Sequence, residues 1–496
     1  MKIKGRFAIL AAIFIATFMT SVEVTIVTTA MPTIISELHG LEIQSWVFSV
    51  YLLISAITTP LYGKLSDNIG RKKIFMFGLF MFIIGSFLCG FASNMLLLIL
   101  FRLIQGIGAG AVLPLTYTII ADLFTFDERA NILAFNNTAW AISALAGPLL
   151  GGWIVDILGW NWVFFINVPL GILTLILTAF GYKDVHQKTK KIEMDWSGLI
   201  SLSFSLMALL MIFQFLSEPV INWSLQVVLF VIFVFAVLWF IKSEKKAKDP
   251  IFELSLFKNK TFTIQIIISL LLSGALMGYN VYFPIWLQAI YRVPAFIAGL
   301  TLTPSSITWM IAGFFVGILM RKFVAKHLFL GLTALLTVIS LPLCFVNANF
   351  PMLSFYLIAA VMGACMGIIL TMSTLIGQNL VSKAHIGLAS SMIVLGRTIG
   401  QAMATGIFGL AFSLGINQGR AQFPTLHSTQ INQLISSNHS STLDFAIREK
   451  IEGIILNAIH HVFFIVTLLC ILTLIVCACE QIKTRKKPPL ETNSEI

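Results

Sequence analysis

Charged residues are scarce in this sequence, and no stretch of it is polar over the length of a soluble domain. Asp, Glu, Lys and Arg together make up only 11% of the 496 residues, whereas 58% of the residues are hydrophobic. A water-soluble core does not need so much apolar surface. The composition therefore excludes an ordinary soluble globular protein and indicates a polytopic membrane protein.

Motifs of enzymes and metal sites are also missing. The sequence has no GxxxxGK[ST] phosphate-binding loop, no HExxH zinc motif and no polar stretch long enough for a nucleotide-binding domain. Its six cysteines have neither disulfide nor zinc spacing, and we interpret them as packing residues. We expect no enzyme activity, no metal and no cofactor. A membrane enzyme or receptor would need paired catalytic groups or a soluble domain, and direct ATP-driven pumping would need a nucleotide site.

Long apolar runs are what the sequence contains instead. Fourteen such runs are separated by charged or turn-forming residues. Each is expected to be a membrane-spanning helix, because lipid cannot satisfy open backbone groups. Their approximate bounds are 7–30, 45–62, 74–92, 95–121, 130–152, 162–182, 197–217, 224–241, 262–289, 297–320, 327–346, 352–380, 386–413 and 453–479.

The basic residues lie in short clusters between these runs. If the N terminus is cytoplasmic, most of the 32 Lys and Arg residues fall in cytoplasmic segments. The positive-inside rule then puts both termini in the cytoplasm and makes 414–452 the longest extracellular loop. Orientation in the membrane, rather than a nucleic-acid partner, thus accounts for the net charge of +11.

Three motifs follow one another along spans two to five. In 63-GKLSDNIGRKKI-74, glycines permit a tight turn, and Asp67 can pair with a basic residue or cap a helix. In 100-LFRLIQGIGAGAVLP-114, Arg102 lies inside the membrane, where it needs a carboxylate, carbonyls or water. The glycines of 143-SALAGPLLGG-152 allow close helix packing, and the proline of this stretch removes one backbone donor and bends the helix.

In this order the three motifs resemble those of the major facilitator superfamily and its proton-coupled exporters. That resemblance implies two six-helix bundles that rock around a central site. The motif residues and candidate gate residues are Gly63, Asp67, Gly70, Arg71, Gly147, Pro148, Gly151 and Arg397. Arg397 can alternatively snorkel as a structural residue.

Three further stretches narrow the resemblance. They are 160-WNWVFFINVPLG-171, 195-DWSG-198 and 282-YFPIWLQAIYRVPAFIAGLTLTPSSI-307. Together with fourteen spans they resemble the fourteen-span drug:proton antiporter family of multidrug efflux type. The family places two extra helices, here at about 197–217 and 224–241, between its two bundles.

The resemblance implies an all-α membrane protein with four parts. Residues 1–182 would form the amino-terminal six-helix bundle, 183–261 the cytoplasmic loops and extra helices, 262–480 the carboxy-terminal bundle, and 481–496 a cytoplasmic tail. We expect a monomer in the cell membrane. The loop 317-GILMRKFVAKH-327 is a degenerate copy of the first motif, so a gate salt bridge there would need other partners.

Glu23 is the acidic residue that lies deepest in an apolar run. It stands within 17-TFMTSVEVTIV-27, where the family commonly has Asp. A carboxyl group in a low-dielectric cavity can titrate in the physiological range. We therefore expect Glu23 to exchange a proton for a cation, with Arg102 on the proton route as the resemblance implies. Alternatively, Glu23 stays neutral, hydrogen-bonded to Thr20, Thr28 or a neighbouring helix, and Arg102 is purely structural.

Candidate substrate contacts cluster in span nine around Pro284, a predicted helix break. Aromatic faces attract cations, although Tyr279 and Trp286 can equally be core or interfacial residues. The candidates are Glu23, Tyr279, Asn280, Trp286, Gln288, Asn137, Trp309 and Gln378, with Asn136 beside them. The sequence predicts an antiporter that exports lipophilic, cationic drugs in exchange for protons. An exporter of an endogenous metabolite, lipid precursor or antibiotic on the same fold is the alternative.

Overall fold

The computed structural model of the chain describes most of the sequence, with gaps in several loops and at the ends. The described residues are 3–38, 44–182, 195–216, 221–247, 254–293, 295–347, 350–382, 385–423 and 445–479. The predicted tail 481–496, residues 183–194 and 248–253 of the predicted cytoplasmic loops, and residues 424–444 of the predicted extracellular loop 414–452 lie outside them. All regular elements within the described residues are helices.

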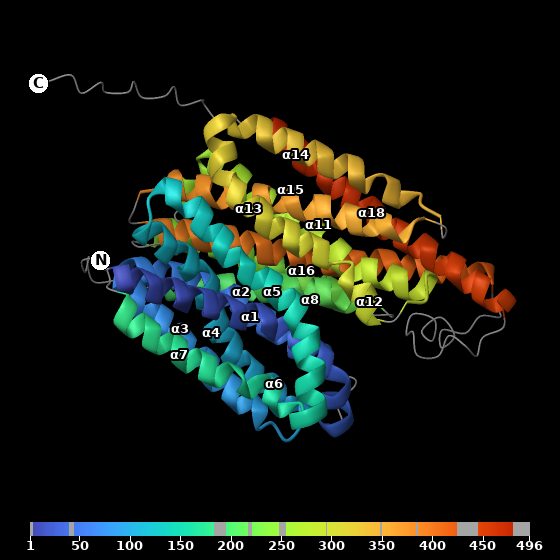
Figure 1. The fold of residues 1–496 in the computed structure, drawn as a ribbon, viewed down its shortest axis with the longest axis horizontal. Helices are drawn as coiled ribbons and strands as arrows, with labels where there is room; N and C mark the ends of the chain where they lie inside the picture. The colour runs from blue at the N-terminus through green and yellow to red at the C-terminus, as the bar shows by residue number, and fades with distance from the viewer. Residues whose placement is uncertain are drawn as a thin grey trace, which may run out of the picture.

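Seven helices build the amino-terminal half. They are α1 (Ile3–Leu38), α2 (Gln44–Ile69), α3 (Arg71–Gly90), α4 (Met95–Leu123), α5 (Phe126–Leu158), α6 (Asn161–Phe165) and α7 (Asn167–Gly181). Helix α4 packs between α2 and α3, and α1 packs between α5 and α7. These helices lie together on one side of the molecule (Figure 1).

The carboxy-terminal half repeats this plan with eight elements. They are α11 (Lys260–Ile290), α12 (Ala295–Leu300), α13 (Thr303–Lys322), α14 (Ala325–Ser340), η2 (Pro342–Cys344), α15 (Met352–Asn379), α16 (Ile386–Gln422) and α18 (Phe445–Ala478). The two halves meet where α5 packs on α13 and α2 packs on α16. Polar residues fix several helix starts, because the side chains of Asn94 and Asn259 accept the first free N–H groups of α4 and α11.

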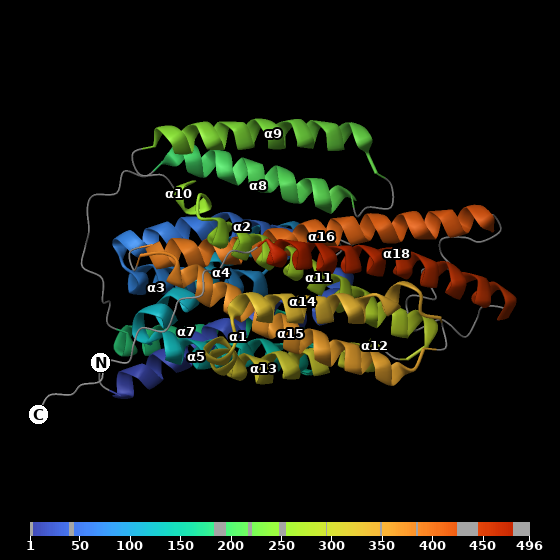
Figure 2. The same ribbon diagram turned by 90° about the horizontal axis from the view of Figure 1, so that it is seen from above.

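Two additional helices, α8 (Trp196–Leu216) and α9 (Trp223–Lys246), form a hairpin outside the two halves; the short α10 (Leu254–Phe257) follows them. Helix α8 packs on α2 and α16, while α9 contacts mainly α8. Figure 2 shows the pair along one edge of the bundle. Apolar side chains of α9 face outward, including Phe235 at 67% exposure, as expected for a helix that lipid surrounds.

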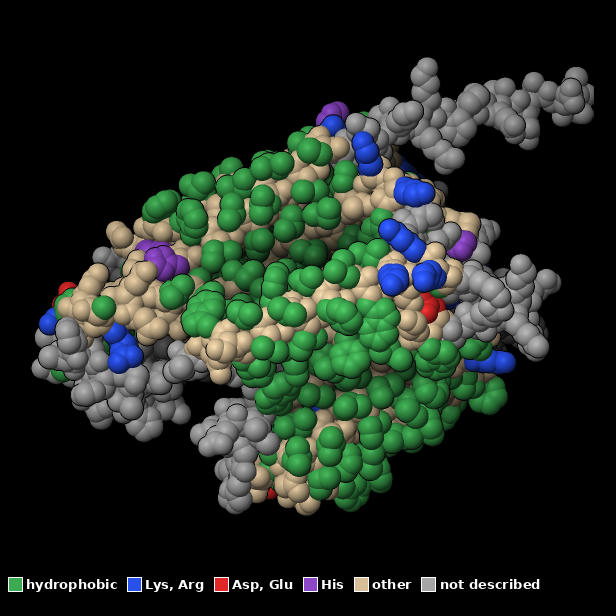
Figure 3. All heavy atoms as spheres, turned by 180° about the vertical axis from the view of Figure 1, so that it is seen from behind, with side chains coloured by type: hydrophobic (Ala, Val, Ile, Leu, Met, Phe, Trp, Pro, Cys, Tyr) green, Lys and Arg blue, Asp and Glu red, His purple; other side chains and the backbone are tan. Residues whose placement is uncertain are grey.

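Helix length and surface composition indicate a multi-span membrane protein. Within the described residues, thirteen helical segments are long and apolar enough to cross a membrane. Hydrophobic side chains cover the middle of the face in Figure 3, and Lys and Arg side chains gather toward its ends. Helix α5 has 33 residues but is not one of the thirteen segments, so the total of fourteen spans stays a prediction.

Several boundaries differ from the sequence prediction. Residues 414–422 and 445–452, predicted to be loop, are helical ends of α16 and α18. The two helices pack closely there, because a Cβ at Gly419 would meet Ile454 at 2.6 Å.

The predicted sixth span is interrupted at Ile166 between α6 and α7. Pro169, three residues later, has no N–H to bond the carbonyl of Phe165.

Candidate functional site

Glu23 and Arg102 form an ion pair in the interior of the amino-terminal half. Nη1 of Arg102 lies 2.5 Å from Oε1 of Glu23, and both side chains are 0% exposed. Helix α1 contributes the carboxylate and α4 the guanidinium. The structure thus brings together the two residues that the sequence analysis expected to act on protons, and it gives the buried arginine the carboxylate that it needs.

Helix α2 completes the surroundings of Arg102. Nε of Arg102 donates to the carbonyl oxygen of Val47 at 3.1 Å, and the guanidinium lies 4.5 Å from the centre of the Tyr51 ring. The face of the Tyr51 ring attracts the positive guanidinium, and this attraction offsets part of the cost of burying the charge away from water. Nη2 of Arg102 is buried and has no hydrogen-bond partner among the described atoms.

Three uncharged residues extend this pair into a buried polar cluster. Nδ2 of Asn167 donates to Oε2 of Glu23 at 2.5 Å. Oε1 of Gln105 accepts from Arg102 at 2.8 Å, and Nε2 of Gln105 donates to Ser86 at 2.6 Å. The sequence analysis missed all three. A signal existed, since Gln105 follows Arg102 by one helical turn and Asn167 stands just before the helix-breaking Pro169.

A row of small polar contacts joins α1 to α5 beside this cluster. Thr17 donates to Asn136 at 3.0 Å, and the hydroxyls of Ser21 and Ser143 lie 2.7 Å apart. Gly147 lets the helices approach, because a Cβ there would meet Oγ1 of Thr25 at 2.0 Å. The predicted close packing of this motif is therefore present.

The other two residues of this motif lie in the same helix. Gly151 is buried, whereas the side chain of Pro148 lies outside the described residues. The helix α5 runs through both positions from Phe126 to Leu158. The role of this motif in the transport cycle stays a prediction.

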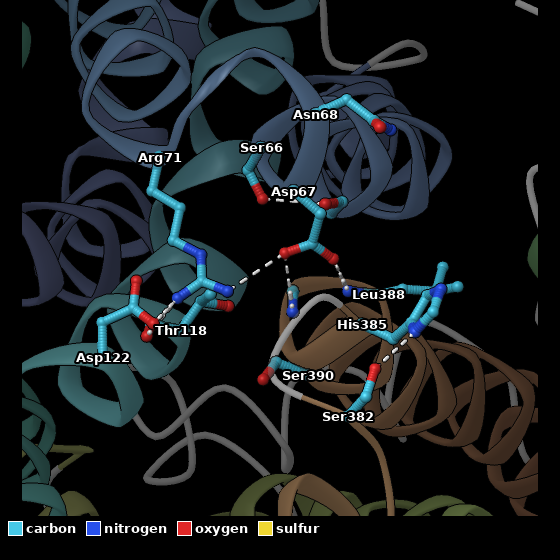
Figure 4. A network of polar contacts seen from close by, with 12 residues as sticks. Ser66, Asp67, Asn68, Arg71, Thr118, Asp122, Ser382, His385, Leu388 and Ser390 are labelled. Atoms are coloured by element: carbon cyan, nitrogen blue, oxygen red, sulfur yellow. Dashed lines mark hydrogen bonds and ion pairs between the residues drawn. The ribbon is translucent and has the colours of Figure 1, made fainter. Parts of the chain in front are cut away.

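Asp67 connects the two halves at one end of the bundle (Figure 4). Its carboxylate accepts the backbone N–H groups of Gly387 and Leu388, at 3.2 and 3.0 Å, in the first turn of α16. A carboxylate at a helix N-terminus is stabilised by the helix dipole, typically by about 0.3–1 kcal/mol. Asp67 thus both pairs with a base and caps a helix, the two possibilities that the sequence offered.

Arg71 is the base that pairs with Asp67. Its Nη2 lies 3.2 Å from Oδ1 of Asp67, and its Nη1 forms a second ion pair with Asp122 of α4. The glycines of the motif serve the close approach of the halves. A Cβ at Gly63 would meet Oγ of Ser391 at 2.3 Å, and Gly70 has a φ of 109° at the start of α3.

Gln378 and Arg397 make a second contact between the halves. Nε2 of Gln378 donates to the carbonyl oxygen of Tyr117 at 3.2 Å, and Arg397 lies 3.5 Å from the Tyr117 hydroxyl. Arg397 also donates to the carbonyl oxygen of Leu370 and the hydroxyl of Thr374, each at 2.7 Å. Arg397 is thus held by one carbonyl and two hydroxyls. Gln378, predicted to contact substrate, bridges α15 and α4 in this conformation.

Tyr279 and Trp286 lie in the packed core of the carboxy-terminal half, at 2% and 0% exposure. Their rings contact Phe463 of α18, and Trp286 also contacts Phe355 of α15. The predicted helix break at Pro284 is wrong, because α11 continues from Lys260 to Ile290. The other backbone hydrogen bonds of a long helix hold it together where one donor is missing.

The remaining candidates lie apart from the ion pair. Asn280 is exposed, whereas Gln288, Asn137 and Trp309 are half-buried. The indole of Trp309 packs on Gly367 of α15. The hydrogen bonds of Glu23 in the described structure go to Arg102 and Asn167 and to none of these four residues. Their contact with substrate stays a prediction.

The described residues contain no group of three or more His, Cys, Asp or Glu side chains that could hold a metal ion. The six cysteines are free thiols, and all but Cys479 are buried. This placement agrees with their interpretation as packing residues.

Comparison with known proteins agrees with this architecture. The sequence model of the Major Facilitator Superfamily matches residues 13–405. The multidrug transporter protein MdtP of Bacillus subtilis is 34% identical over 428 residues, which cover 85% of this chain and 77% of that protein. The multidrug efflux pump SdrM of Staphylococcus aureus is 30% identical over 430 residues, which cover 86% of this chain and 94% of that protein.

A solved structure supports the fold independently of close sequence similarity. The human organic anion transporter MFSD10 superposes with a TM-score of 0.64 at 11% identity, over 95% of this chain and 99% of that one. At this identity the similarity concerns the fold alone. It extends over both halves of the chain.

Proposed function

This chain belongs to the major facilitator superfamily, and from that premise we propose that it exports lipophilic, cationic compounds from the cell in exchange for protons. Relatives along most of its length are multidrug efflux transporters, which supports the export of drugs. The observation that carries the proton-exchange part is the fully buried Glu23–Arg102 pair. Such charges inside a membrane are costly and are typical of ion and proton pathways.

The proposed exchange depends on competition for one carboxylate. When Glu23 is ionised, it neutralises Arg102 and can attract a cation. When Glu23 binds a proton, that negative charge disappears and the ion pair with Arg102 is weakened. A proton and a cationic substrate therefore exclude one another at the same oxygens. Exchange follows if the carrier switches between its inward-open and outward-open states more readily when Glu23 holds a proton or a cation than when it holds neither.

The contact between Asp67 and α16 is the proposed cytoplasmic gate. We propose fourteen spans with both termini in the cytoplasm, which places the 63–74 loop and this contact on the cytoplasmic side. In the conformation described here the halves are joined at that end. Rocking of the halves would break the joint and admit substrate from the cytoplasm. The carrier would work as a monomer.

The test is proton-driven transport of a cationic dye by purified protein in proteoliposomes. Glu23→Gln keeps the size of the side chain but cannot ionise, so we expect proton-driven dye flux to fall by roughly tenfold or more. Glu37→Gln is the matched control on the same helix, because among the described residues Glu37 accepts a hydrogen bond from Trp160, at 2.8 Å, and none from Arg102. Its flux should stay near that of the wild type.

Two outcomes would overturn the proposal. One is wild-type exchange by Glu23→Gln, and the other is dye flux that a protonophore leaves unchanged. If the wild type moves an endogenous metabolite, lipid precursor or antibiotic in a proton-dependent way but no lipophilic cation, the cargo part fails and the exchange part stands.

A further inference from the structure

Asn167 is a buried amide that uses only one of its two ends. It is the first residue of α7 and is 0% exposed. Its Nδ2 donates to Oε2 of Glu23 at 2.5 Å, while its Oδ1 is buried without a hydrogen-bond partner among the described atoms. Buried polar atoms are normally satisfied, so an orphaned acceptor beside a carboxylate needs an explanation.

The groups around Glu23 suit its ionised form. Arg102 offers only N–H donors, and Oε1 of Gln105 already accepts from Arg102 at 2.8 Å. The other titratable groups facing the cluster from the described helices are Tyr51 of α2 and Cys89 of α3. Once Glu23 takes up a proton, its new O–H needs an acceptor. Among the described atoms, Oδ1 of Asn167 is a buried acceptor without a partner on a side chain that already contacts Glu23.

We propose that Asn167 is the positioning residue that sets the pH at which Glu23 exchanges its proton. Its amide donates to the carboxylate, and after a half-turn about the Cβ–Cγ bond it accepts from the carboxylic acid. No proton is transferred to Asn167; the proton stays on Oε2 of Glu23, and only the amide changes its orientation. An amide suits this task because its two ends are similar in size and opposite in hydrogen-bonding role.

This proposal rests on the proposed function, since it requires Glu23 to titrate. Two substitutions separate the roles of the amide. Asn167→Leu removes the donor and the acceptor. The ionised form of Glu23 then loses more stabilisation than the protonated form, because a hydrogen bond to a charged group is stronger than one between neutral groups. Asn167→Asp places a second carboxyl beside Glu23, so that the pair holds one proton tightly. Both changes should move proton release to higher pH.

The measurement is an infrared titration of purified protein in nanodiscs, which follows the C=O band of the neutral carboxylic acid. The band that disappears in Glu23→Gln belongs to Glu23. We expect its midpoint to rise by about one pH unit in Asn167→Leu and by more in Asn167→Asp. Its frequency in Asn167→Leu should also shift, because the acid has lost its acceptor. If Asn167 had a role in packing alone, neither the midpoint nor the frequency of the band would change in Asn167→Leu.

Asn161→Leu is the matched control. Asn161 lies six residues earlier, in α6, and its amide donates to the backbone carbonyl oxygen of Gly90 at 2.7 Å. The midpoint of the Glu23 band in Asn161→Leu should equal that of the wild type. If Asn167→Leu does not accumulate as folded protein, Asn167→Ala takes its place, because it also removes the donor and the acceptor without adding a charge.

The outcomes distinguish the two proposals. If no band is lost in Glu23→Gln, Glu23 is not the titrating group and the proposed function fails. If the Glu23 band is present but its midpoint is the same in Asn167→Leu or Asn167→Ala as in the wild type, the role of Asn167 is overturned and the proposed function stands.

Discussion

At the centre of the amino-terminal half, Glu23 and Arg102 meet among amides and a hydroxyl, whereas the carboxy-terminal half is filled by aromatic rings around Trp286. The intramembrane charge of the carboxy-terminal half, Arg397, is held by a carbonyl and a hydroxyl instead of a carboxylate. Two halves with the same helical plan thus place their charges differently. The difference supports the proposal that proton exchange takes place in the first half, and it shows apolar packing at the centre of the second.

The loops that follow the second helix of each half show the same contrast. In the first loop Arg71 is 0% exposed and is paired with both Asp67 and Asp122. In the second loop, Arg321 takes the place of Asp67 by alignment and is exposed. In the contact between the halves, the amino-terminal half therefore contributes the carboxylate of Asp67, and the carboxy-terminal half contributes the backbone N–H groups at the start of α16.

The largest effect should come from breaking the buried ion pair. Arg102→Met leaves the Glu23 carboxylate unpaired, so we expect a loss of about 3–5 kcal/mol in the free energy of unfolding. The loss should be larger at alkaline than at acidic pH, because protonation of Glu23 removes the unpaired charge. Thermal unfolding in detergent at several pH values measures this, and Glu23→Gln should rescue it.

Arg397→Met is the matched control in the other half. Arg397 donates to Leu370 and Thr374, so its loss should cost about 1–2 kcal/mol without a dependence on pH. If the loss of stability depended on pH equally in Arg102→Met and Arg397→Met, the two buried arginines would not differ in their pairing with a titratable carboxylate.

Trp286→Ala tests whether the aromatic centre is core. Trp286 is 0% exposed, and truncation of such a side chain leaves a cavity that costs about 3–5 kcal/mol. We expect lower thermal stability at all pH values and an unchanged KM for dye at a temperature where the variant is folded. Trp223→Ala, at a position 65% exposed, should lose no more than about 0.5 kcal/mol. A raised KM with unchanged stability would instead support Trp286 as a substrate contact.

Gly63→Ala should weaken the joint between the halves. The new Cβ would meet Oγ of Ser391 at 2.3 Å and the carbonyl oxygen of Gly387 at 3.0 Å, so the joined state should lose about 1–3 kcal/mol. The rate of thiol modification at Ser390→Cys, a buried position beside the joint, should rise in a background without Cys479. Gly152→Ala, where a Cβ meets nothing within 4 Å, should leave the rate unchanged.

Asp67→Asn should have the smallest effect of this series. It keeps the shape of the side chain but removes the charge that attracts Arg71 and the N-terminus of α16, which is worth about 1 kcal/mol. The same thiol assay should show a moderate rise in modification rate. Asn68→Ala is the control, because Asn68 donates only to the carbonyl oxygen of Lys64 within its own helix, at 3.0 Å. Equal rates of thiol modification in Asp67→Asn and Asn68→Ala would show that Asp67 does not hold the proposed gate closed.

Residues that carry charge within apolar runs were found from the sequence. Glu23 and Arg102 stood out because an uncompensated charge in an apolar run needs a reason, whereas Asp67 stood out through the motif 63-GKLSDNIGRKKI-74; each of the three has a partner in the structure. Asn167 and Gln105 did not stand out, since single amides are common in membrane helices. The aromatic candidates failed to converge on Glu23 because composition does not reveal which face of a helix turns toward its own half.

By itself the sequence determined the class of the protein, the approximate position of its helices and the presence of an acid and a base inside them. These properties follow from the local cost of placing polar groups in lipid. The tertiary structure alone decided that Glu23 meets both Arg102 and Asn167, and that Asp67 reaches α16. Those partners lie 79, 144 and 321 positions apart in the chain, so only the packing of whole helices brings them within hydrogen-bonding distance.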